Sequence, residues 1–391
     1  MTIIFLHNIF EKSINGEWGN EDSGKGEATA VIRTSNFLNS GRLNLDNIVC
    51  REIDKDKNSD KILRTGDIII EKSGGSPNQP VGRVVYFDVT DQDYFTNNFT
   101  SILRVKPGYN SKYIFYLMKY LYDTKKVLKF QNQTTGIINL KLADYLNKTK
   151  VNIETIENQN TIVDILDRLE YQIINRNKQI SELSNLVKSR FNELFGDPVL
   201  NDMGWERCRL KDISVEKLAY GSGASAIEFS GLRYIRITDI DTCGNLKPEK
   251  KSPSQFDEKY LLNTGDILFA RSGATVGKTF LYSKKKHGPA LYAGYLIRLI
   301  PNHSLVNPIF VYHFTKTKYY NDFIAKVQNA VAQPNINAKQ YSELDFILPP
   351  LALQNEFADF VAQVDKSQLA IQKSLEELET LKKSLMQEYF G

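Results

Sequence analysis

The sequence predicts an α+β protein in which two β-rich domains are joined by two long antiparallel coiled-coil helices, with the second half repeating the first about a pseudo-two-fold axis. Two observations predict this fold class. A stretch with a helical hydrophobic pattern near the middle of the chain, 154–196, has a degenerate copy at its end, 351–391. The segments before these two stretches share motifs in the same order and consist of short β-type runs.

The two helical stretches carry the same seam of side chains. In the first, alternating steps of four and three residues, the spacing of a coiled-coil seam, connect Ile162, Leu166, Leu169, Ile173, Ile180, Leu183, Val187 and Leu194. Adding 195 to each number gives Phe357, Val361, Val364, Gln368, Leu375, Leu378, Lys382 and Tyr389. Both copies end on Phe-Gly, where glycine is suited to stop a helix. In an antiparallel pair, Gln368 would lie level with Leu183, and Arg176 with Leu375.

The segments in front of the helices also align. Residues 30–44 (AVIRTSNFLNSGRLN) match 233–247 (RYIRITDIDTCGNLK), and 64–75 (RTGDIIIEKSGG) match 263–274 (NTGDILFARSGA). The offset ends at 195, about half of the 391 residues, which indicates an internal duplication. We place the domains at 1–153 and 198–350 and the helices at 154–197 and 351–391, because Asp197-Pro198 and Pro349-Pro350 break the helical pattern.

Within each domain the sequence predicts strands separated by Gly, Asn and Pro turns, with one helix among them. In the first domain we expect strands at 67–70, 81–87 and 101–105 and a helix at 111–121. In the second we expect strands at 234–240, 266–270, 279–282 and 296–299 and a helix at 307–317. The apolar start of the chain is short and lacks basic residues, so we take it as the first element of a domain and not as a signal peptide.

The charge distribution separates the domains from the helices. Residues 1–153 carry 21 basic and 17 acidic side chains, residues 198–350 carry 20 and 14, and the two helices together carry 9 and 15. Basic domains favour a polyanionic ligand and acidic helices favour a protein partner, although a solvated surface of mixed charge gives the same balance. Three distant cysteines, Cys50, Cys208 and Cys243, favour a reducing cytoplasm, and no segment predicts a membrane span.

Two motifs imitate catalytic sites. RSGATVGKT, residues 271–279, resembles a phosphate-binding P-loop, but three residues instead of four separate its key glycines, and both flanks predict strands. Asp67 with Glu71 and Lys72 imitates a metal-dependent nuclease, yet the second copy has Ala270-Arg271 in place of Glu71-Lys72, so a salt bridge explains the carboxylate better. We therefore expect a chain that is not itself an enzyme, without a cofactor or a metal.

The loops after the central strands are the candidate DNA contacts. A cationic side chain, a hydroxyl and exposed backbone N–H groups in one loop suit phosphates and base edges, although an ordinary glycine hairpin with solvated charges explains the same residues. The candidates are Arg271, Ser272, Gly273, Thr275 and Lys278 in the second domain and Lys72, Ser73, Gly74 and Arg83 in the first. The set is completed by the aligned Arg33 and Arg236 and by Tyr220 and Ser222 of a YGSG loop, whose counterpart we place around Trp18-Gly19.

This arrangement resembles the specificity subunit of type I restriction-modification systems. The resemblance is carried by LFG before Asp-Pro, by YGSGAS, RYIRITDI, TGDILFARSG and VGK, and by LPPLALQNEF at the second helix. It implies that each domain is a target-recognition domain reading one half of a split site in double-stranded DNA. It also implies that the helices are spacers that bind two DNA methyltransferase (M) subunits, through which restriction (R) subunits join. A free-standing DNA-binding regulator and a coiled-coil scaffold remain as alternatives, and recruitment of a methyltransferase distinguishes them.

Overall fold

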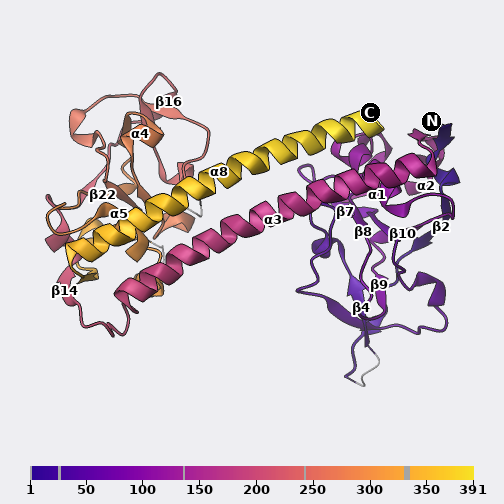
Figure 1. The fold of residues 1–391 in the computed structure, drawn as a ribbon, viewed down its shortest axis with the longest axis horizontal. Coiled ribbons are helices and arrows are strands. Elements are labelled where there is room, and N and C mark those ends of the chain that lie inside the picture. The colour runs from indigo at the N-terminus through magenta and orange to yellow at the C-terminus, as the bar shows by residue number, and fades with distance from the viewer. Residues whose placement is uncertain (1, 25–27, 135–136, 242–243, 330–334) are drawn as a thin grey trace. The chain divides into compact units, whose positions relative to one another are not determined.

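The computed structural model describes residues 2–24, 28–134, 137–241, 244–329 and 335–391. The chain divides into two compact units, Met1–Arg176 with Ser374–Gly391, and Asn177–Lys373. Each unit holds one β-rich lobe together with part of each long helix. We call residues 2–153 the N-terminal lobe and residues 206–348 the C-terminal lobe. In Figure 1 the first unit combines the indigo and purple lobe with the yellow end of the chain.

The N-terminal lobe is built on an antiparallel sheet of order β2-β10-β6-β8. A second sheet of order β3-β5-β4-β9 contains a parallel pair, β4 with β9, and a third has the order β11-β12-β7. The strands are β1 (Thr2–Phe5), β2 (Phe10–Asn15), β3 (Asn20–Glu21), β4 (Ala28–Ile32), β5 (Val49–Glu52), β6 (Ile68–Glu71), β7 (Ser73–Gly75), β8 (Val84–Tyr86), β9 (Tyr94–Thr96), β10 (Thr100–Val105), β11 (Gln131–Thr134), β12 (Ile137–Leu140) and β13 (Lys150–Ile153). Helix α1 (Ser111–Asp123) packs its buried face on this core, and α2 (Leu142–Lys148) follows β12.

The C-terminal lobe is built on a sheet of order β15-β22-β19-β20, with a separate parallel pair, β17 with β21. Its strands are β14 (Glu206–Arg209), β15 (Ala219–Tyr220), β16 (Ala226–Glu228), β17 (Arg233–Ile235), β18 (Lys251–Pro253), β19 (Ile267–Ala270), β20 (Thr279–Leu281), β21 (Ala290–Tyr292), β22 (Leu296–Leu299) and β23 (Asp345–Leu348). Its helices are α4 (Lys284–His287), α5 (Pro308–Phe314), α6 (Lys318–Asn329) and α7 (Ala338–Ser342).

The two lobes repeat one frame, as the sequence predicts. The sheet β2-β10-β6-β8 corresponds to β15-β22-β19-β20, the parallel pair β4/β9 to β17/β21, and the antiparallel pair β1/β13 to β14/β23. Asp67 and Asp266 follow the equivalent glycines before β6 and β19, and each is buried and accepts a main-chain hydrogen bond from three residues before it. The duplication is therefore visible in strand pairing and in buried polar contacts.

Each long helix is fixed to its lobe by the same Gln-Asn pair. The helices are α3 (Ile156–Phe195) and α8 (Leu351–Phe390). Gln159 Oε1 accepts a hydrogen bond from Asn110 N (2.9 Å), and Asn110 Nδ2 donates to Asn160 Oδ1 (2.8 Å). In the second unit Asn307 makes the same two bonds to Gln354 and the asparagine after it. Because Asn110 and Asn307 also cap α1 and α5, the contact joins the start of a lobe helix to the start of a long helix.

Within each unit the long helices pack antiparallel, which confirms the expected pairing. In the first unit Lys382 Nζ forms an ion pair with Glu170. In the second, Gln368 Nε2 donates to Ser184 Oγ (3.1 Å), one residue from the predicted level of Leu183. The polar seam residues thus bond sideways to neighbours on the partner helix instead of being buried without a partner.

A second face of the helices, which the seam pattern does not contain, packs into the lobes. Phe191 and Phe195 of α3 are buried, and both rings lie against Phe310 of α5, at centroid distances of 5.6 and 4.6 Å. Phe390 of α8 lies 5.2 Å from Tyr113 of α1. The seam pattern predicts packing between the two long helices, whereas these aromatic residues attach the ends of the helices to the cores of the lobes.

The expectation of one helix per lobe is wrong, because α2, α4, α6 and α7 are present in addition to α1 and α5. These helices are short or follow another helix directly, so they lack a separate hydrophobic pattern. The strand expected at 234–240 ends at Ile235, because the Asp239 side chain accepts a hydrogen bond from Arg236 N and turns the chain into a 3-10 helix. Cys50 and Cys208 are free thiols, and Cys243 lies outside the described residues.

Candidate nucleic-acid interface

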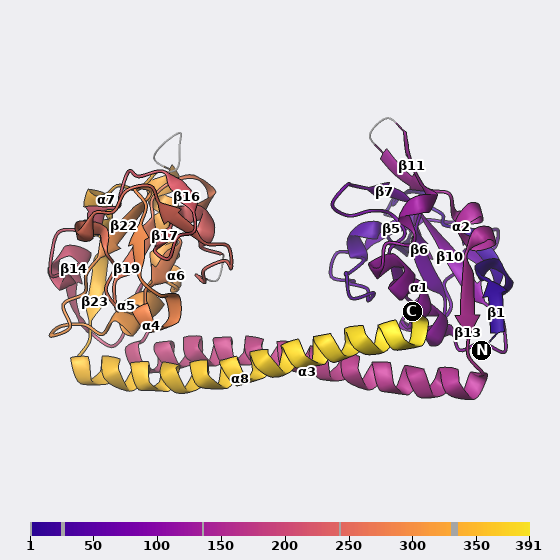
Figure 2. The same ribbon diagram turned by 90° about the horizontal axis from the view of Figure 1, so that it is seen from above.

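The central strands β6 and β19 lead away from the long helices. The glycine before each strand lies beside the lobe helix that is tied to a long helix, since Gly66 faces Ser111 of α1 and Gly265 faces Pro308 of α5. The other ends, Glu71 and Ala270, therefore lie at the end of each lobe that is far from the long helices. Figure 2 shows β7, which follows Glu71, at this end of the N-terminal lobe. We call Lys72–Gly74 the N-terminal tip and Arg271–Thr275 the C-terminal tip.

The C-terminal tip holds Arg271 in a defined position. Its guanidinium lies over the Tyr220 ring, 4.6 Å from the centroid, and Arg271 Nε donates to Asn335 Oδ1 (3.3 Å). The Tyr220 hydroxyl in turn accepts a hydrogen bond from Ala338 N (3.0 Å). Among the described residues, stacking and this one hydrogen bond leave other guanidinium N–H groups of Arg271 for a ligand. Arg271 is also half-buried, so these contacts fix the orientation of its side chain before a ligand binds.

The rest of the C-terminal tip is a tight loop. Thr275 Oγ1 donates to Ser272 O (2.9 Å), and the backbone of Lys278 closes the loop through Ala270 N to Lys278 O (2.8 Å). Gly273 has φ +65°, and among the described residues no atom lies within 4 Å of the place where its Cβ would stand. The loop is therefore open to the close approach of a ligand backbone.

The N-terminal tip presents a lysine at the equivalent place. Lys72 Nζ donates to Asn15 Oδ1 (2.7 Å), and burial lowers the pKa of Lys72, which a phosphate would raise again by favouring the charged form. Ser73 Oγ donates to Asn139 Oδ1 (2.6 Å), so the Ser73 hydroxyl is hydrogen-bonded to a side chain of β12. Gly74 has φ +97° and, within the described part of the chain, is as open as Gly273.

The expected DNA contact through Arg83 needs correction. Arg83 is 9% exposed, and its Nε and Nη2 donate to the two carboxylate oxygens of Glu71 at 2.8 and 3.0 Å. Arg83 Nη2 also donates to Thr34 O (3.1 Å). The guanidinium of Arg83 is thus part of a buried ion pair that stabilises the lobe. Its partner Glu71 belongs to the apparent nuclease motif, so this carboxylate forms a salt bridge, as the sequence analysis favours.

Three further candidates are held by contacts inside their lobes. Arg236 Nη2 donates to Asp239 Oδ1 (2.6 Å), and Arg33 Nη2 donates to Asn47 O (3.1 Å). Ser222 is 7% exposed, and its Oγ accepts a hydrogen bond from Ala224 N (3.1 Å). The side chains of Arg236 and Ser222 are thus engaged within the C-terminal lobe, and that of Arg33 within the N-terminal lobe.

The counterpart of the Tyr220-Gly221 pair in the YGSG loop is Asn15-Gly16, three residues before the Trp18-Gly19 pair that the sequence suggests. Gly16 N donates to Thr100 O and Gly221 N to Leu296 O, which are equivalent bonds onto β10 and β22. A Cβ at either glycine would lie within 2.4 Å of a main-chain oxygen, so both positions require glycine. Asn15 and Tyr220 are therefore equivalent, and each contacts the cation of its own tip. Trp18 instead stacks under the guanidinium of Arg51 (4.1 Å).

Comparison with known proteins decides the family. Residues 1–185 and 203–381 each match the family model described as the type I restriction modification DNA specificity domain. The chain belongs to this specificity family. The double match also confirms the internal repeat and the two target-recognition domains that the sequence predicts.

Curated relatives in the specificity family are moderately similar to the chain. The type I restriction enzyme MjaVIII specificity subunit of Methanocaldococcus jannaschii is 24% identical over 294 residues, covering 70% of this chain and 68% of the relative. The putative MjaX specificity subunit of the same organism is 30% identical over 225 residues, covering 54% and 50%. The StySPI specificity subunit of Salmonella potsdam is 22% identical over 381 residues, covering 92% and 81%.

Solved structures of the specificity family share the fold. The S subunit of a type I restriction-modification system from M. genitalium matches with a TM-score of 0.61 at 15% identity, over 100% of this chain and 96% of that one. A chain from a structure concerned with complex assembly and conformational transition of the type I system matches with a TM-score of 0.57 at 16% identity, over 99% and 96%.

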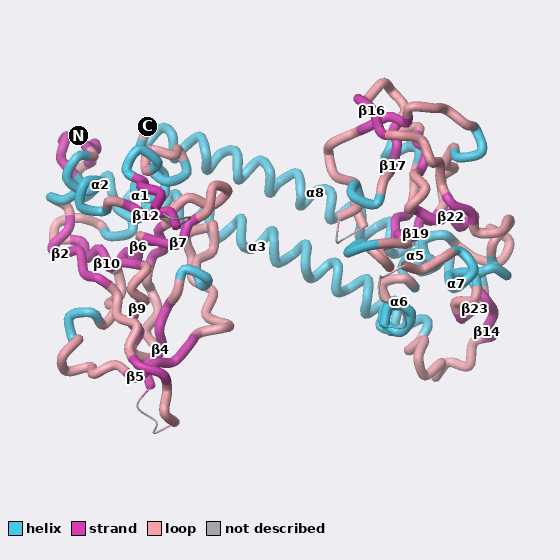
Figure 3. Tube along the Cα trace, turned by 180° about the vertical axis from the view of Figure 1, so that it is seen from behind, coloured by secondary structure: helices cyan, strands magenta, loops and turns pink. Residues whose placement is uncertain are grey.

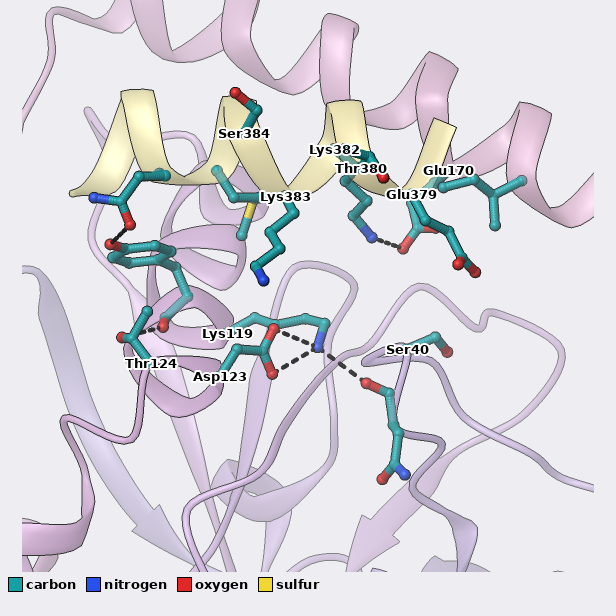
Figure 4. Close-up of a pocket in the computed structure, with 15 residues that line it drawn as sticks. Ser40, Lys119, Asp123, Thr124, Glu170, Glu379, Thr380, Lys382, Lys383 and Ser384 are labelled. Atoms are coloured by element: carbon teal, nitrogen blue, oxygen red, sulfur yellow. Dashed lines mark hydrogen bonds and ion pairs between the residues drawn. The ribbon is translucent and has the colours of Figure 1, made fainter. Parts of the chain in front are cut away.

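A groove of about 680 Å³ lies in the first unit at the opposite side of the N-terminal lobe from its tip, between α1 and the long helices. Lys119 Nζ bonds to Asp123 at one wall, and the Tyr120 hydroxyl donates to Gln387 Oε1 (2.7 Å) at its end. Figure 4 shows Lys383 reaching from α8 toward Lys119 and Asp123. The first unit thus has a concave surface beside its long helices as well as a polar tip.

The second unit has a groove of about 400 Å³ that is lined by Lys188, Phe191 and Asn192 of α3, by residues that follow α3, and by residues between 313 and 318. Adding 195 to these three numbers gives Lys383, Met386 and Gln387, which line the first groove. In the part of the chain that the structure describes, no group of three or more His, Cys, Asp or Glu side chains could hold a metal ion. None of the described helices is long and apolar enough to cross a membrane. Figure 3 shows the C-terminal end of α8 beside α1 in the first unit.

Proposed function

We propose that this chain reads a two-part DNA target for a type I restriction-modification complex. The N-terminal lobe reads one half-site and the C-terminal lobe reads the other, each through its tip. The long helices bind two DNA methyltransferase subunits, through which restriction subunits join. The chain supplies sequence recognition, and its partners supply the chemistry.

The observation that carries the proposal is a cation in the same place on a duplicated frame. Lys72 and Arg271 follow equivalent strands, and equivalent neighbours, Asn15 and Tyr220, hold them. Arginine pairs bidentately with guanine and stacks on aromatic rings, whereas lysine acts as a point charge. Two lobes with one frame and different tip residues are suited to two different half-sites, so the target need not be a palindrome.

The repeated grooves support a pair of like partners. The helical stretches 154–197 and 351–391 carry 9 basic and 15 acidic side chains, opposite in balance to the lobes, which favours binding to protein over binding to DNA. Lys383, Met386 and Gln387 of the first groove stand at an offset of 195 from Lys188, Phe191 and Asn192 of the second, so we infer that one kind of subunit docks at both. Two equivalent surfaces on a pseudo-symmetric chain predict two copies of that subunit.

Methylation mapping tests the proposal directly. Cells that express this chain with its methylase should carry methylation at a two-part motif with a fixed gap, and cells that express the methylase alone should not. Affinity purification of the chain should recover the methylase. A chain that binds DNA without recovering it supports a free-standing regulator, and a chain that binds the methylase without a two-part motif supports a scaffold.

Exchange of one lobe is the sharper version of this experiment. Replacing residues 198–350 by the same lobe of another specificity subunit should change one half of the motif and leave the other half and the gap unchanged. The matched exchange of residues 1–153 should change the opposite half. A motif altered in both halves by a single exchange contradicts independent reading.

A further inference from the structure

In each lobe an exposed aromatic residue is hydrogen-bonded through its main chain to the cationic residue of the tip. Phe99, between β9 and β10, is 50% exposed, and Tyr295, between β21 and β22, is 61% exposed. Phe99 O accepts a hydrogen bond from Lys72 N (2.7 Å), and Tyr295 O accepts one from Arg271 N (3.1 Å). The two aromatic residues therefore occupy the same place in the repeat.

The turn that carries Phe99 is fixed to the lobe. Asn97 N donates to Ile32 O at the end of β4 (3.0 Å), and Thr100 N donates to Asn97 O (3.1 Å), which closes the turn. Thr100 is 0% exposed, and its Oγ1 also donates to Asn97 O (2.7 Å). The backbone under the exposed ring is thus hydrogen-bonded on both sides.

The turn that carries Tyr295 repeats this pattern with other side chains. Ala293 N donates to Ile235 O at the end of β17 (2.9 Å), and Leu296 N donates to Ala293 O (2.8 Å). Gly294 N adds a bond to Ser222 O (2.8 Å). In both lobes the aromatic residue is the third residue of a turn that closes onto the end of a parallel strand pair.

A single exposed aromatic residue needs no explanation, because folded proteins expose many apolar atoms. Its recurrence in two lobes with different residues, each time on a fixed turn next to the tip cation, does need one. An aromatic side chain has only two rotatable bonds, so a ring on a rigid turn loses little conformational entropy when it binds. Packing within the lobe does not account for the half of each ring that faces solvent.

We propose that Phe99 and Tyr295 contact the bases of the two half-sites. Each ring makes an apolar contact in the groove that the neighbouring cation enters, as apolar side chains do with the C5-methyl group of thymine. This inference rests on the proposed function and adds a base contact that carries no charge. Each tip then reads DNA with a cation and a ring together.

The test uses the complex of this chain with its methylase and a duplex that carries the mapped two-part motif. Phe99→Ala and Tyr295→Ala are compared with the wild type by fluorescence anisotropy at several salt concentrations, with each base pair of both half-sites replaced in turn. We expect a loss of affinity of about 10- to 100-fold, as for the loss of one base-pair contact. Discrimination should relax at one or two adjacent positions of the half-site read by the altered lobe. The salt dependence should stay as in the wild type, because a ring releases no counterion.

Matched variants separate the ring from exposed apolar surface in general. Val215, which is 62% exposed, bonds through its N to Ile300 O beyond the other end of β22, and Ile3, which is 69% exposed, lies in β1. Val215→Ala and Ile3→Ala should leave affinity unchanged. Tyr295→Phe keeps the ring and should bind nearly as well as the wild type.

Wild-type affinity and discrimination in an alanine variant overturn the proposal for that lobe. Equal relaxation in both half-sites, or a weaker salt dependence, also overturns it, since the latter indicates a phosphate contact. Thermal unfolding is measured for every variant, and Phe99→Leu and Tyr295→Leu are judged by the same criteria if alanine lowers Tm. Absence of two-part methylation by the wild-type complex contradicts the proposed function instead, and that result precedes any variant.

Discussion

Gln354 is the side chain on which we expect the attachment of α8 to the C-terminal lobe to depend. It is 0% exposed, its Oε1 accepts a hydrogen bond from Asn307 N (2.8 Å), and its Nε2 donates to Pro349 O (2.7 Å) and Leu305 O (3.2 Å). Gln354→Ala removes all three bonds at once. A buried polar group left without its partner costs about 1–3 kcal/mol, and relaxation around the site limits the sum, so we expect a loss of about 2–4 kcal/mol in the free energy of unfolding.

Urea unfolding and differential scanning calorimetry measure this loss. For a unit of 150–250 residues, Tm falls by about 2–4 °C per kcal/mol, so the transition of the second unit should fall by about 4–16 °C. Gln363→Ala, at an exposed position of the same helix, is the control and should change stability by less than about 0.5 kcal/mol. Equally small losses in the two variants would refute the role assigned to Gln354.

Arg83→Ala leaves Glu71, whose side chain is 3% exposed, without its cation. Since breaking a buried ion pair costs about 3–5 kcal/mol, urea unfolding should show a loss of this order, and Arg83→Met combined with Glu71→Gln should recover part of it. Arg271→Ala and Lys278→Ala should keep Tm and weaken DNA binding through one half-site. A base contact costs about 1–3 kcal/mol and relaxes one position, whereas a phosphate contact lowers the salt slope by about one; wild-type binding in both variants would remove this loop from the interface. Burial, with Lys316 nearby, lowers the pKa of His313 to about 4, so protonation favours the unfolded chain. Stability should be complete above about pH 6.5 and fall by up to about 3 kcal/mol as the pH drops toward 4. His313→Phe should remove this fall, and an unchanged pH profile of Tm in that variant contradicts the assignment.

The long helices and the repeat are predictable because their signals are local in the sequence. A heptad seam depends on residues a few positions apart, and the duplication depends on motifs in the same order. The residues that attach helix to lobe carry no such signal. Phe191 and Phe195 lie off the seam and pack on Phe310, and the Gln159 contact to Asn110 joins residues 49 positions apart.

The tips are only partly predictable, because they depend on strand register. Glu71 N donates to Arg83 O, and Ala270 N donates to Lys278 O, so Arg83 and Lys278 are equivalent residues. In the first lobe the residue opposite Arg83 is Glu71, and Arg83 forms a buried ion pair with it. In the second lobe the residue opposite Lys278 is Ala270, which has no charge to pair with the lysine. Two aligned cationic residues thus lie in different environments, and the residue opposite them on the neighbouring strand accounts for the difference.

The equivalence of Asn15 with Tyr220, and of Phe99 with Tyr295, also follows from register and not from sequence. Asn15 and Tyr220 are identified by their pairing with β10 and β22, and Phe99 and Tyr295 by main-chain bonds to the residue that follows β6 or β19. Sequence alignment places the YGSG counterpart at Trp18-Gly19 because it compares residue types, whereas the fold requires a glycine where the chain crosses main-chain oxygens. The tip residues that we propose to contact DNA are therefore those for which sequence similarity is least informative.

The final prediction concerns the long helices as spacers. α3 and α8 are each a single helix of 40 residues. Both pass from one unit to the other, between Arg176 and Asn177 in α3 and between Lys373 and Ser374 in α8. Inserting one heptad at each of these two points keeps the seam in phase and leaves the residues of both units unchanged. Each helix grows by about 10.5 Å, close to three base pairs at about 3.4 Å each.

We expect the methylated motif to keep its bases while its gap grows by about three base pairs. Three base pairs also turn the far half-site by about 100° around the duplex, so methylation at the new gap should be slower, and the quantity to measure is the preferred gap. Inserting five residues at the same points is the control, because it rotates the seam by about 140° and should disrupt the helix pair. If the heptad variant still methylates DNA at the original gap, the helices do not set the spacing between half-sites, and their interpretation as spacers is wrong.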